Sequence, residues 1–221
     1  MPEGKTLEKW KPDFRARPFS ALAIASRNSG KSYLIRHLIQ DQLTHEYDMI
    51  IVVCGTQHEL GAYREAMPEG QQASYYATWD AHIYNQVVRA NRQRGRQGKR
   101  PFRVLMVIDD TLEITNDPSL KKVYTTGRHD NISVIYLAQS TVLASTVWRA
   151  NSDLVFLLKT NGPGARRQIL KNFLEGSTDL EEGVNETRFY NEIIRNYASR
   201  VGDALVLDNR GQTELYWYRA P

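Results

Sequence analysis

The sequence predicts an α/β protein with a mainly parallel central sheet, helices on both faces and a C-terminal β-hairpin. The first reason is that apolar runs with the length of buried strands alternate with segments of helical length. The second is an apolar strand, a turn and an apolar helix in direct succession over residues 20–43, with Gly-Lys-Ser at 30–32 closing the turn. The third is a pair of apolar segments within 204–218, separated by a turn at 209–211, which is typical of a hairpin.

The individual elements follow from local patterns. Residues 48–54 form a nearly unbroken apolar run, as expected for a buried parallel strand, whereas 55–72 are polar with Gly and Pro and predict a loop. Asp80 suits the N-cap of a helix that continues to about residue 93. The remaining elements expected in chain order are strands at 20–25, 74–76, 104–108, 132–139 and 153–158, and helices at 30–43, 118–126, 142–149, 164–174 and 185–199.

Size and composition indicate one ordinary domain. The chain has 221 residues, of which 41% are hydrophobic and 24% charged, and these are globular values. We expect residues 1–18 to form an arm and residues 19–221 a single domain. No apolar run approaches the ~18 residues of a membrane span, and the first residues lack the apolar core of a secretion signal. The single cysteine, Cys54, excludes an internal disulfide, and an intracellular, non-secreted protein is expected.

The turn after the first strand resembles the phosphate-binding pattern G-x-x-x-x-G-K-[ST], except that Ala25 replaces the first glycine. Backbone N–H groups at a helix start attract phosphate, and the lysine and serine of the pattern serve the β- and γ-phosphates and Mg²⁺. The strand before the turn and the helix after it supply the structural context that a chance Gly-Lys-Ser would lack. We therefore expect ATP to be bound by Ser26, Arg27, Asn28, Ser29, Gly30, Lys31 and Ser32.

Carboxylates that end a second apolar strand, expected to neighbour the first in the sheet, are expected to complete the site. Asp109 and Asp110 follow residues 104–108, so they reach the same sheet edge as the turn. Successive residues of a strand point in opposite directions, so we assign Asp109, with Ser32, to Mg²⁺ and Asp110 to the activation of water. Glu113 is a weaker candidate for that base. The alternative for the Asp-Asp pair is a simple turn signal.

Three further side chains are candidates for catalysis. Gln139 ends the next strand and is expected to contact the γ-phosphate or orient the water, the alternative being an ordinary loop residue. Multimeric ATPases commonly use an arginine from the adjacent subunit. Arg128 and Arg149 are the candidates here, and Arg128 is slightly preferred. Either arginine could instead be a surface residue paired with an acid.

A basic segment lies between residues 89 and 103, with seven basic residues and no acid. It enters the amino-terminal end of the strand at 104–108, which is the sheet edge opposite the expected nucleotide. Its arginines face either a nucleic-acid backbone or a partner surface, or else form a solvated loop.

Several of these segments resemble the genome-packaging ATPases of large double-stranded DNA viruses, the poxvirus-type branch of the FtsK/HerA superfamily. The segments are 26–32, 107–110, 127–139 and 149–152. The segment Gly-Arg-His-Asp-Asn-Ile-Ser-Val-Ile-Tyr-Leu-Ala-Gln at 127–139 is the most specific, and the first is generic. The similarity extends over about residues 20–160.

The resemblance implies a RecA-like, additional-strand P-loop ATPase with ATP and Mg²⁺ as cofactors. It implies a homo-oligomeric ring, usually of five or six subunits, that translocates double-stranded DNA into a preformed capsid and meets capsid vertex proteins. Such a chain is compatible with a monomer in isolation that assembles on the capsid. Its expected location is the host cytoplasm, a viral assembly site or the virion. Lys31, Ser32, Asp109, Asp110 and Gln139 match the family's ATP site.

Two departures from the family pattern bear on these assignments. Ala25 stands where glycine is usual, and Asp110 stands where many members of the superfamily have glutamate, one methylene longer. No nuclease domain follows the similar region, so DNA cleavage is not expected.

Two other functions share the loop pattern. A nucleotide or small-molecule kinase would hydrolyse ATP only with its acceptor, and a nucleotide-dependent switch would hold ATP with negligible turnover. A translocase would show ATPase activity that duplex DNA stimulates.

Overall fold

The structure is a computed structural model that describes residues 6–11, 14, 17–43, 46–109, 111, 117–139, 146–174 and 186–221. Within these residues the chain forms an eight-stranded sheet with helices packed against it. The strands are β1 (Ser20–Ile24), β2 (Met49–Cys54), β3 (Ala73–Tyr76), β4 (Val104–Asp109), β5 (Ile132–Ala138), β6 (Leu154–Leu158), β7 (Asp203–Asp208) and β8 (Glu214–Arg219). The α-helices are α1 (Lys31–Leu38), α2 (Gln57–Glu65), α3 (Ala81–Arg96), α4 (Pro118–Thr126), α5 (Thr146–Ala150), α6 (Pro163–Ile169) and α7 (Glu186–Tyr197).

The strand order is β3-β2-β4-β5-β1-β6-β7-β8, and β1 lies between β5 and β6. The first six strands along the chain pair in parallel, while β7 pairs antiparallel with β6 and β8 antiparallel with β7. The predicted fold is therefore confirmed as a mainly parallel α/β sheet that ends in an antiparallel hairpin. Because the six parallel strands share one direction, the loops that follow them meet at one edge of the sheet.

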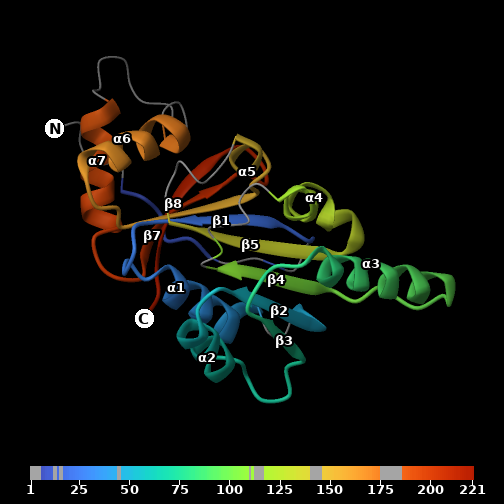
Figure 1. Cartoon of the computed structure of the whole chain (residues 1–221). Helices are drawn as coiled ribbons and strands as arrows, with labels where there is room; N and C mark the ends of the chain where they lie inside the picture. The colour runs from blue at the N-terminus through green and yellow to red at the C-terminus, as the bar shows by residue number, and fades with distance from the viewer. Residues whose placement is uncertain are drawn as a thin grey trace.

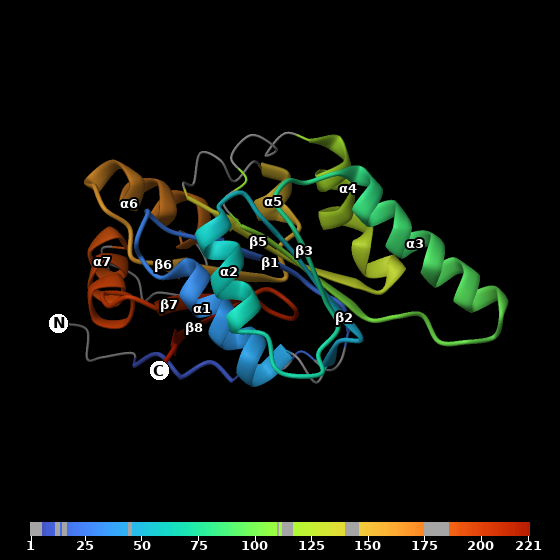
Figure 2. The same ribbon diagram turned by 60° about the horizontal axis from the view of Figure 1, so that its bottom comes forward.

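Helices cover both faces of the sheet, as Figure 1 and Figure 2 show. One face packs against α1 and α2, and the other packs against α3, α4, α5 and α7. Alternation along β1 explains this division, since Ala21 and Ala23 face the first layer while Leu22 and Ile24 face the second. All four side chains are buried, so a strand covered on both faces needs the continuous apolar run that the sequence shows.

The prediction of a loop over residues 55–72 was wrong. Helix α2 occupies Gln57–Glu65 and buries Leu60 and Tyr63, which are three residues apart on one face. That apolar stripe is too narrow to outweigh the polar, glycine-containing composition of the segment. Two shorter deviations occur where predicted helices end, because Ile39–Leu43 and Leu170–Leu174 continue α1 and α6 as π-helix.

The segment before β1 packs against the C-terminal hairpin. The backbone N–H of Trp10 donates to the carbonyl of Trp217 at 2.8 Å, and the Trp10 ring is buried edge-on against Phe156 and Tyr218. Figure 1 shows this N-terminal segment near the β7–β8 end of the sheet. Among the described residues, no helix combines the length and the apolar character needed to cross a lipid bilayer.

Candidate nucleotide site

The loop between β1 and α1 forms a tight, curved turn. Asn28 and Gly30 adopt positive φ angles of 57° and 89°, and Gly30 precedes the first residue of α1. The Ser29 hydroxyl donates to the Ser26 carbonyl. Lys31 is a buried residue, only 8% exposed, and its ammonium donates to the carbonyls of Ala25 and Ser26, each at 3.2 Å. The lysine is therefore held inside the curve of the loop, where an anion above the helix N-terminus would meet it.

Ala25 is accommodated because it continues the strand. Its N–H donates to the carbonyl of Ala138 at 3.3 Å, which extends the β1–β5 ladder by one residue. Among the described residues other than glycine, only Asn28 and Asn131 have positive φ, so Ala25 does not need the left-handed conformation that favours glycine.

Asp109, the last residue of β4, lies directly beside this loop. Its carboxylate accepts hydrogen bonds from the hydroxyls of Ser32 and Tyr63, the latter at 3.0 Å, and it interacts electrostatically with Lys31. Burial raises the pKa of the Asp109 carboxyl above its ordinary value, and Ser32, Tyr63 and Lys31 oppose that rise. The structure thus brings together one lysine, one serine and one carboxylate from two different strand ends.

Strands β1 and β4 are not neighbours, contrary to our expectation that adjacent strands would supply the two halves of the site. Strand β5 runs between them, with Ile24 of β1 opposite Ala138 and Ile108 of β4 opposite Tyr136. Gln139 follows Ala138 and therefore leaves the sheet edge between the loop and Asp109. The predicted sharing of one sheet edge holds, but the spacing across that edge includes one extra strand.

Two predicted catalytic residues, Asp110 and Glu113, lie outside the described residues. Their assignments remain predictions.

Tyr63 is a site residue that sequence reasoning missed. Its side chain is fully buried, and its ring lies 5.6 Å from the Arg36 guanidinium, which forms an ion pair with Glu59 at 2.5 Å. These contacts fix α2 against α1 and aim the Tyr63 hydroxyl at Asp109. The apolar spacing of Leu60 and Tyr63 was the available signal, and the loop assignment concealed it.

The turn before β7 packs against the β1–α1 loop. The N–H of Gly202 donates to the carbonyl of Ser29 at 3.4 Å. A Cβ atom on Gly30 would lie 2.5 Å from the Gly202 nitrogen and 2.8 Å from a methyl carbon of Val201. Glycine is required at position 30 because the two backbones touch there, and local sequence gives no sign of this contact.

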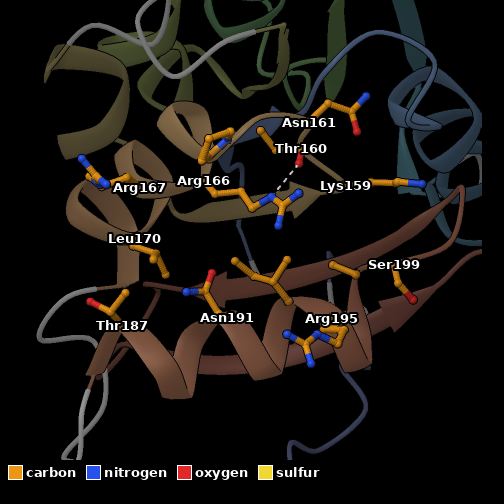
Figure 3. A pocket seen from close by; sticks show the side chains of 13 residues that line it. Lys159, Thr160, Asn161, Arg166, Arg167, Leu170, Thr187, Asn191, Arg195 and Ser199 are labelled. Carbon is orange, nitrogen blue, oxygen red and sulfur yellow. Dashed lines mark hydrogen bonds between the residues drawn. The ribbon is translucent and has the colours of Figure 1, made fainter.

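A cavity of about 790 Å³ opens beside the same loop, between α6, α7 and the end of β6. Figure 3 shows side chains of α6 and α7 on opposite sides of the cavity, with Arg166 bonded to the Thr160 carbonyl. The N–H of Asn161, a lining residue, donates to the Ser26 hydroxyl at 2.9 Å and so joins the cavity to the loop. The described lining residues include four cations and no acid; the cations are Lys159, Arg166, Arg167 and Arg195.

The two candidate arginines lie away from this edge. Arg128 is in the 3-10 turn Gly127–Asp130 that precedes β5, and its guanidinium lies 3.8 Å from the Asp153 carboxylate. Arg149 lies in α5, which precedes β6. Both arginines are therefore near the amino ends of the parallel strands, opposite the loop of their own chain.

No protein-family model matches the chain. Two curated viral proteins are similar to it. The first, the uncharacterized protein 015R of Frog virus 3, is 25% identical over 205 residues, covering 90% of this chain and 61% of the relative. The second, the uncharacterized protein L437 of Acanthamoeba polyphaga mimivirus, is 22% identical over 220 residues, covering 91% of this chain and 72% of the relative. The chain thus spans less than two thirds of the length of the Frog virus 3 protein.

Comparison with solved structures shows that the chain has the RecA-like α/β fold, which P-loop ATPases share. The DNA-packaging ATPase B204 of Sulfolobus turreted icosahedral virus matches with a TM-score of 0.61 and 17% identity, covering 90% of this chain and 98% of that one. B204 of Sulfolobus turreted icosahedral virus 2 in complex with AMPPCP gives 0.58 and 17%, covering 90% and 97%. ATPases 2 and 3 of Thermomonospora curvata EccC give 0.61 and 12%, covering 95% and 38%. At these identities the likeness establishes the fold.

Proposed function

We propose that this protein is an ATP-hydrolysing motor that translocates double-stranded viral DNA into a preformed capsid. The observation that carries the proposal is the contact between Ser32 and Asp109, with Lys31 beside it. A loop with the phosphate-binding pattern and a buried carboxylate from a separate strand meet at one point of the sheet edge. The fold shared with DNA-packaging and other ATPases supports the same function.

Each residue of the loop has a defined part in this proposal. Lys31 neutralises the β- and γ-phosphates, and the backbone of residues 26–31 surrounds them. Ser32 and Asp109 hold Mg²⁺, since a hydroxyl and a carboxylate are the hard oxygen ligands that this ion prefers and the two side chains already touch. When bound, the ion neutralises charge on the phosphate oxygens.

The cavity beside the loop is the proposed place for the nucleoside part of ATP. Its volume suits a nucleotide-sized ligand. Leu170 and Ala198 give it buried apolar lining, while Asn191 supplies donor and acceptor atoms for a base edge. The hydrogen bond between Asn161 and Ser26 makes the cavity continuous with the phosphate end.

The remaining roles depend on a ring of subunits. Asp110 activates the attacking water, with Glu113 as the weaker alternative, and Gln139 orients that water or contacts the γ-phosphate. Arg128 or Arg149 acts on the site of the adjacent subunit, because both lie at the opposite edge from their own loop. The ring, duplex DNA and the capsid vertex are the proposed assembly.

The first test compares Lys31→Ala with the exposed control Lys11→Ala. Phosphate release should fall about 10²-fold or more in Lys31→Ala and stay unchanged in the control. Asp110→Asn should retain binding of a fluorescent ATP analogue while losing turnover. Wild-type turnover in Lys31→Ala would refute the site assignment.

A second test separates a motor from the other functions that share the loop. Phosphate release by the wild type should rise when duplex DNA is added, and light scattering should show assembly with DNA and a non-hydrolysable ATP analogue. Turnover that requires a small acceptor would indicate a kinase, and bound nucleotide without turnover would indicate a switch.

A further inference from the structure

The structure divides the basic segment 89–103 into two groups with different surroundings. Three of its seven basic residues are engaged within the molecule. Arg94 lies 4.0 Å from the Phe102 ring centre and donates to the Arg100 carbonyl at 2.8 Å. Arg100 forms a two-pronged ion pair with Asp48 at 2.6 and 3.0 Å, and Arg103 lies 3.5 Å from the Glu46 carboxylate. These three side chains hold the segment in place.

Two of the remaining residues, Arg89 and Arg92, line a groove. They are one helical turn apart on α3 and exposed, and Lys122 of α4 and His129 of the following 3-10 turn form the facing wall. The groove has a volume of about 410 Å³. Figure 1 shows α3 and α4 on the same face of the sheet.

Charge in this groove is unbalanced. The single acid among its described lining residues is Asp130, whose carboxylate already accepts the Tyr84 hydroxyl at 2.7 Å. Among the described residues, no ion pair involves Arg89, Arg92 or Lys122. Cations on both walls of a groove attract a ligand that carries regularly spaced negative charge, which a phosphodiester backbone does.

We propose that the groove between α3 and α4 binds the phosphodiester backbone of duplex DNA. Arg89 and Arg92 contact phosphates from one wall and Lys122 from the other, and the exposed Asn85 amide is available as a neutral hydrogen-bond donor. The groove lies towards the amino ends of β4 and β5, away from the β1–α1 loop, so DNA and nucleotide do not compete for space. The proposal rests on the proposed DNA partner and names the surface that meets it.

The basic segment offers a matched control. Arg96 and Lys99 belong to the same segment and are exposed, but they do not line the groove. Arg89→Gln/Arg92→Gln and Arg96→Gln/Lys99→Gln therefore remove the same number of charges from the same region. Lys122→Gln tests the facing wall, which lies outside the basic segment.

The experiment measures anisotropy of a fluorescein-labelled DNA duplex across a series of KCl concentrations. The slope of log K against log salt should become shallower by about 0.9 for each lost phosphate contact. The slope should therefore become shallower by about two such increments in the groove pair and by about one in Lys122→Gln, while the control pair keeps the wild-type slope. Equal losses in both pairs, an unchanged groove pair, or no duplex binding by the wild type would overturn the proposal.

Phosphate release without DNA separates this proposal from the proposed motor. All three variants should keep the wild-type rate, because none of these side chains touches the nucleotide site. Groove-dependent DNA binding by a chain that hydrolyses no ATP would support the groove and refute the motor. DNA-stimulated hydrolysis together with DNA binding that does not depend on the groove residues would support the motor and refute the groove.

Discussion

Replacing Tyr63 by phenylalanine should weaken the site through a single lost hydroxyl. The variant keeps the ring that packs against Arg36 and removes only the donor to Asp109. A hydrogen bond to a charged group contributes about 1.5–3 kcal/mol, and the acceptor here is 3% exposed, so water does not replace the donor. The expected loss in the free energy of unfolding is of that size. It corresponds to a fall of about 3–12 °C in the midpoint of thermal unfolding.

The effect should depend on pH with a definite sign. Burial already raises the pKa of Asp109, and loss of the Tyr63 donor raises it further. A carboxyl whose pKa is raised in the folded state loses its contribution to stability as the pH rises through that pKa. The stability gap between wild type and variant should therefore be larger at pH 8 than below the ordinary pKa of aspartate, where the carboxyl is protonated in both folded and unfolded chains. In the proposed site Asp109 holds Mg²⁺ as an ionised carboxylate, so the onset of Mg²⁺-dependent ATP binding should move to higher pH in the variant.

Urea unfolding followed by circular dichroism at several pH values measures the first effect, and titration with a fluorescent ATP analogue and Mg²⁺ measures the second. Tyr75→Phe is the control, because the Tyr75 ring lies 5.2 Å from the Arg64 guanidinium and its hydroxyl makes no hydrogen bond among the described residues. That control should change stability by less than about 0.5 kcal/mol. Equal stability of Tyr63→Phe and wild type, or a gap that does not vary with pH, would refute the link between Tyr63 and Asp109.

Two further predictions concern the turn before β7 and the candidate arginines. Gly202→Ala should weaken ATP binding and cost about 1–3 kcal/mol of stability, since φ is +82° and the added Cβ would meet an aromatic ring at 3.1 Å. Gly70→Ala has a similar φ of +80° with no atom within 4 Å, so it should cost stability without affecting ATP binding. Titration with the fluorescent ATP analogue measures binding by both variants, and urea unfolding measures their stability. For the arginine proposed to act in trans, mixing its alanine variant, Arg128→Ala or Arg149→Ala, with Lys31→Ala should restore part of the hydrolysis that each lacks alone. An arginine whose alanine variant hydrolyses ATP at the wild-type rate has no such role.

Local pattern was sufficient for much of the fold. Strands such as Met49–Cys54 and Ile132–Ala138 were predicted within a residue or two, because a strand buried on both faces requires an unbroken apolar run. Helix Pro118–Thr126 was predicted with its observed ends, and the Asp117 side chain caps it by accepting from the N–H groups of Ser119 and Leu120. Helix α2 was missed because only two of its residues are buried, which leaves too weak an apolar pattern.

The sequence by itself determined that Lys31 and Ser32 follow a buried strand, that Asp109 ends another, and that both strands deliver these residues to one edge of a parallel sheet. The tertiary structure decided the rest: β5 between the two strands, Tyr63 on Asp109, and Gly202 against the loop. The same holds for the basic segment, since only the folded chain shows which arginines are used internally and which face Lys122. The reason is that the spacing of apolar residues along the sequence indicates whether a side chain is buried, but not which segment covers it. The segment that buries it is set by strand order and by packing between residues far apart in the chain.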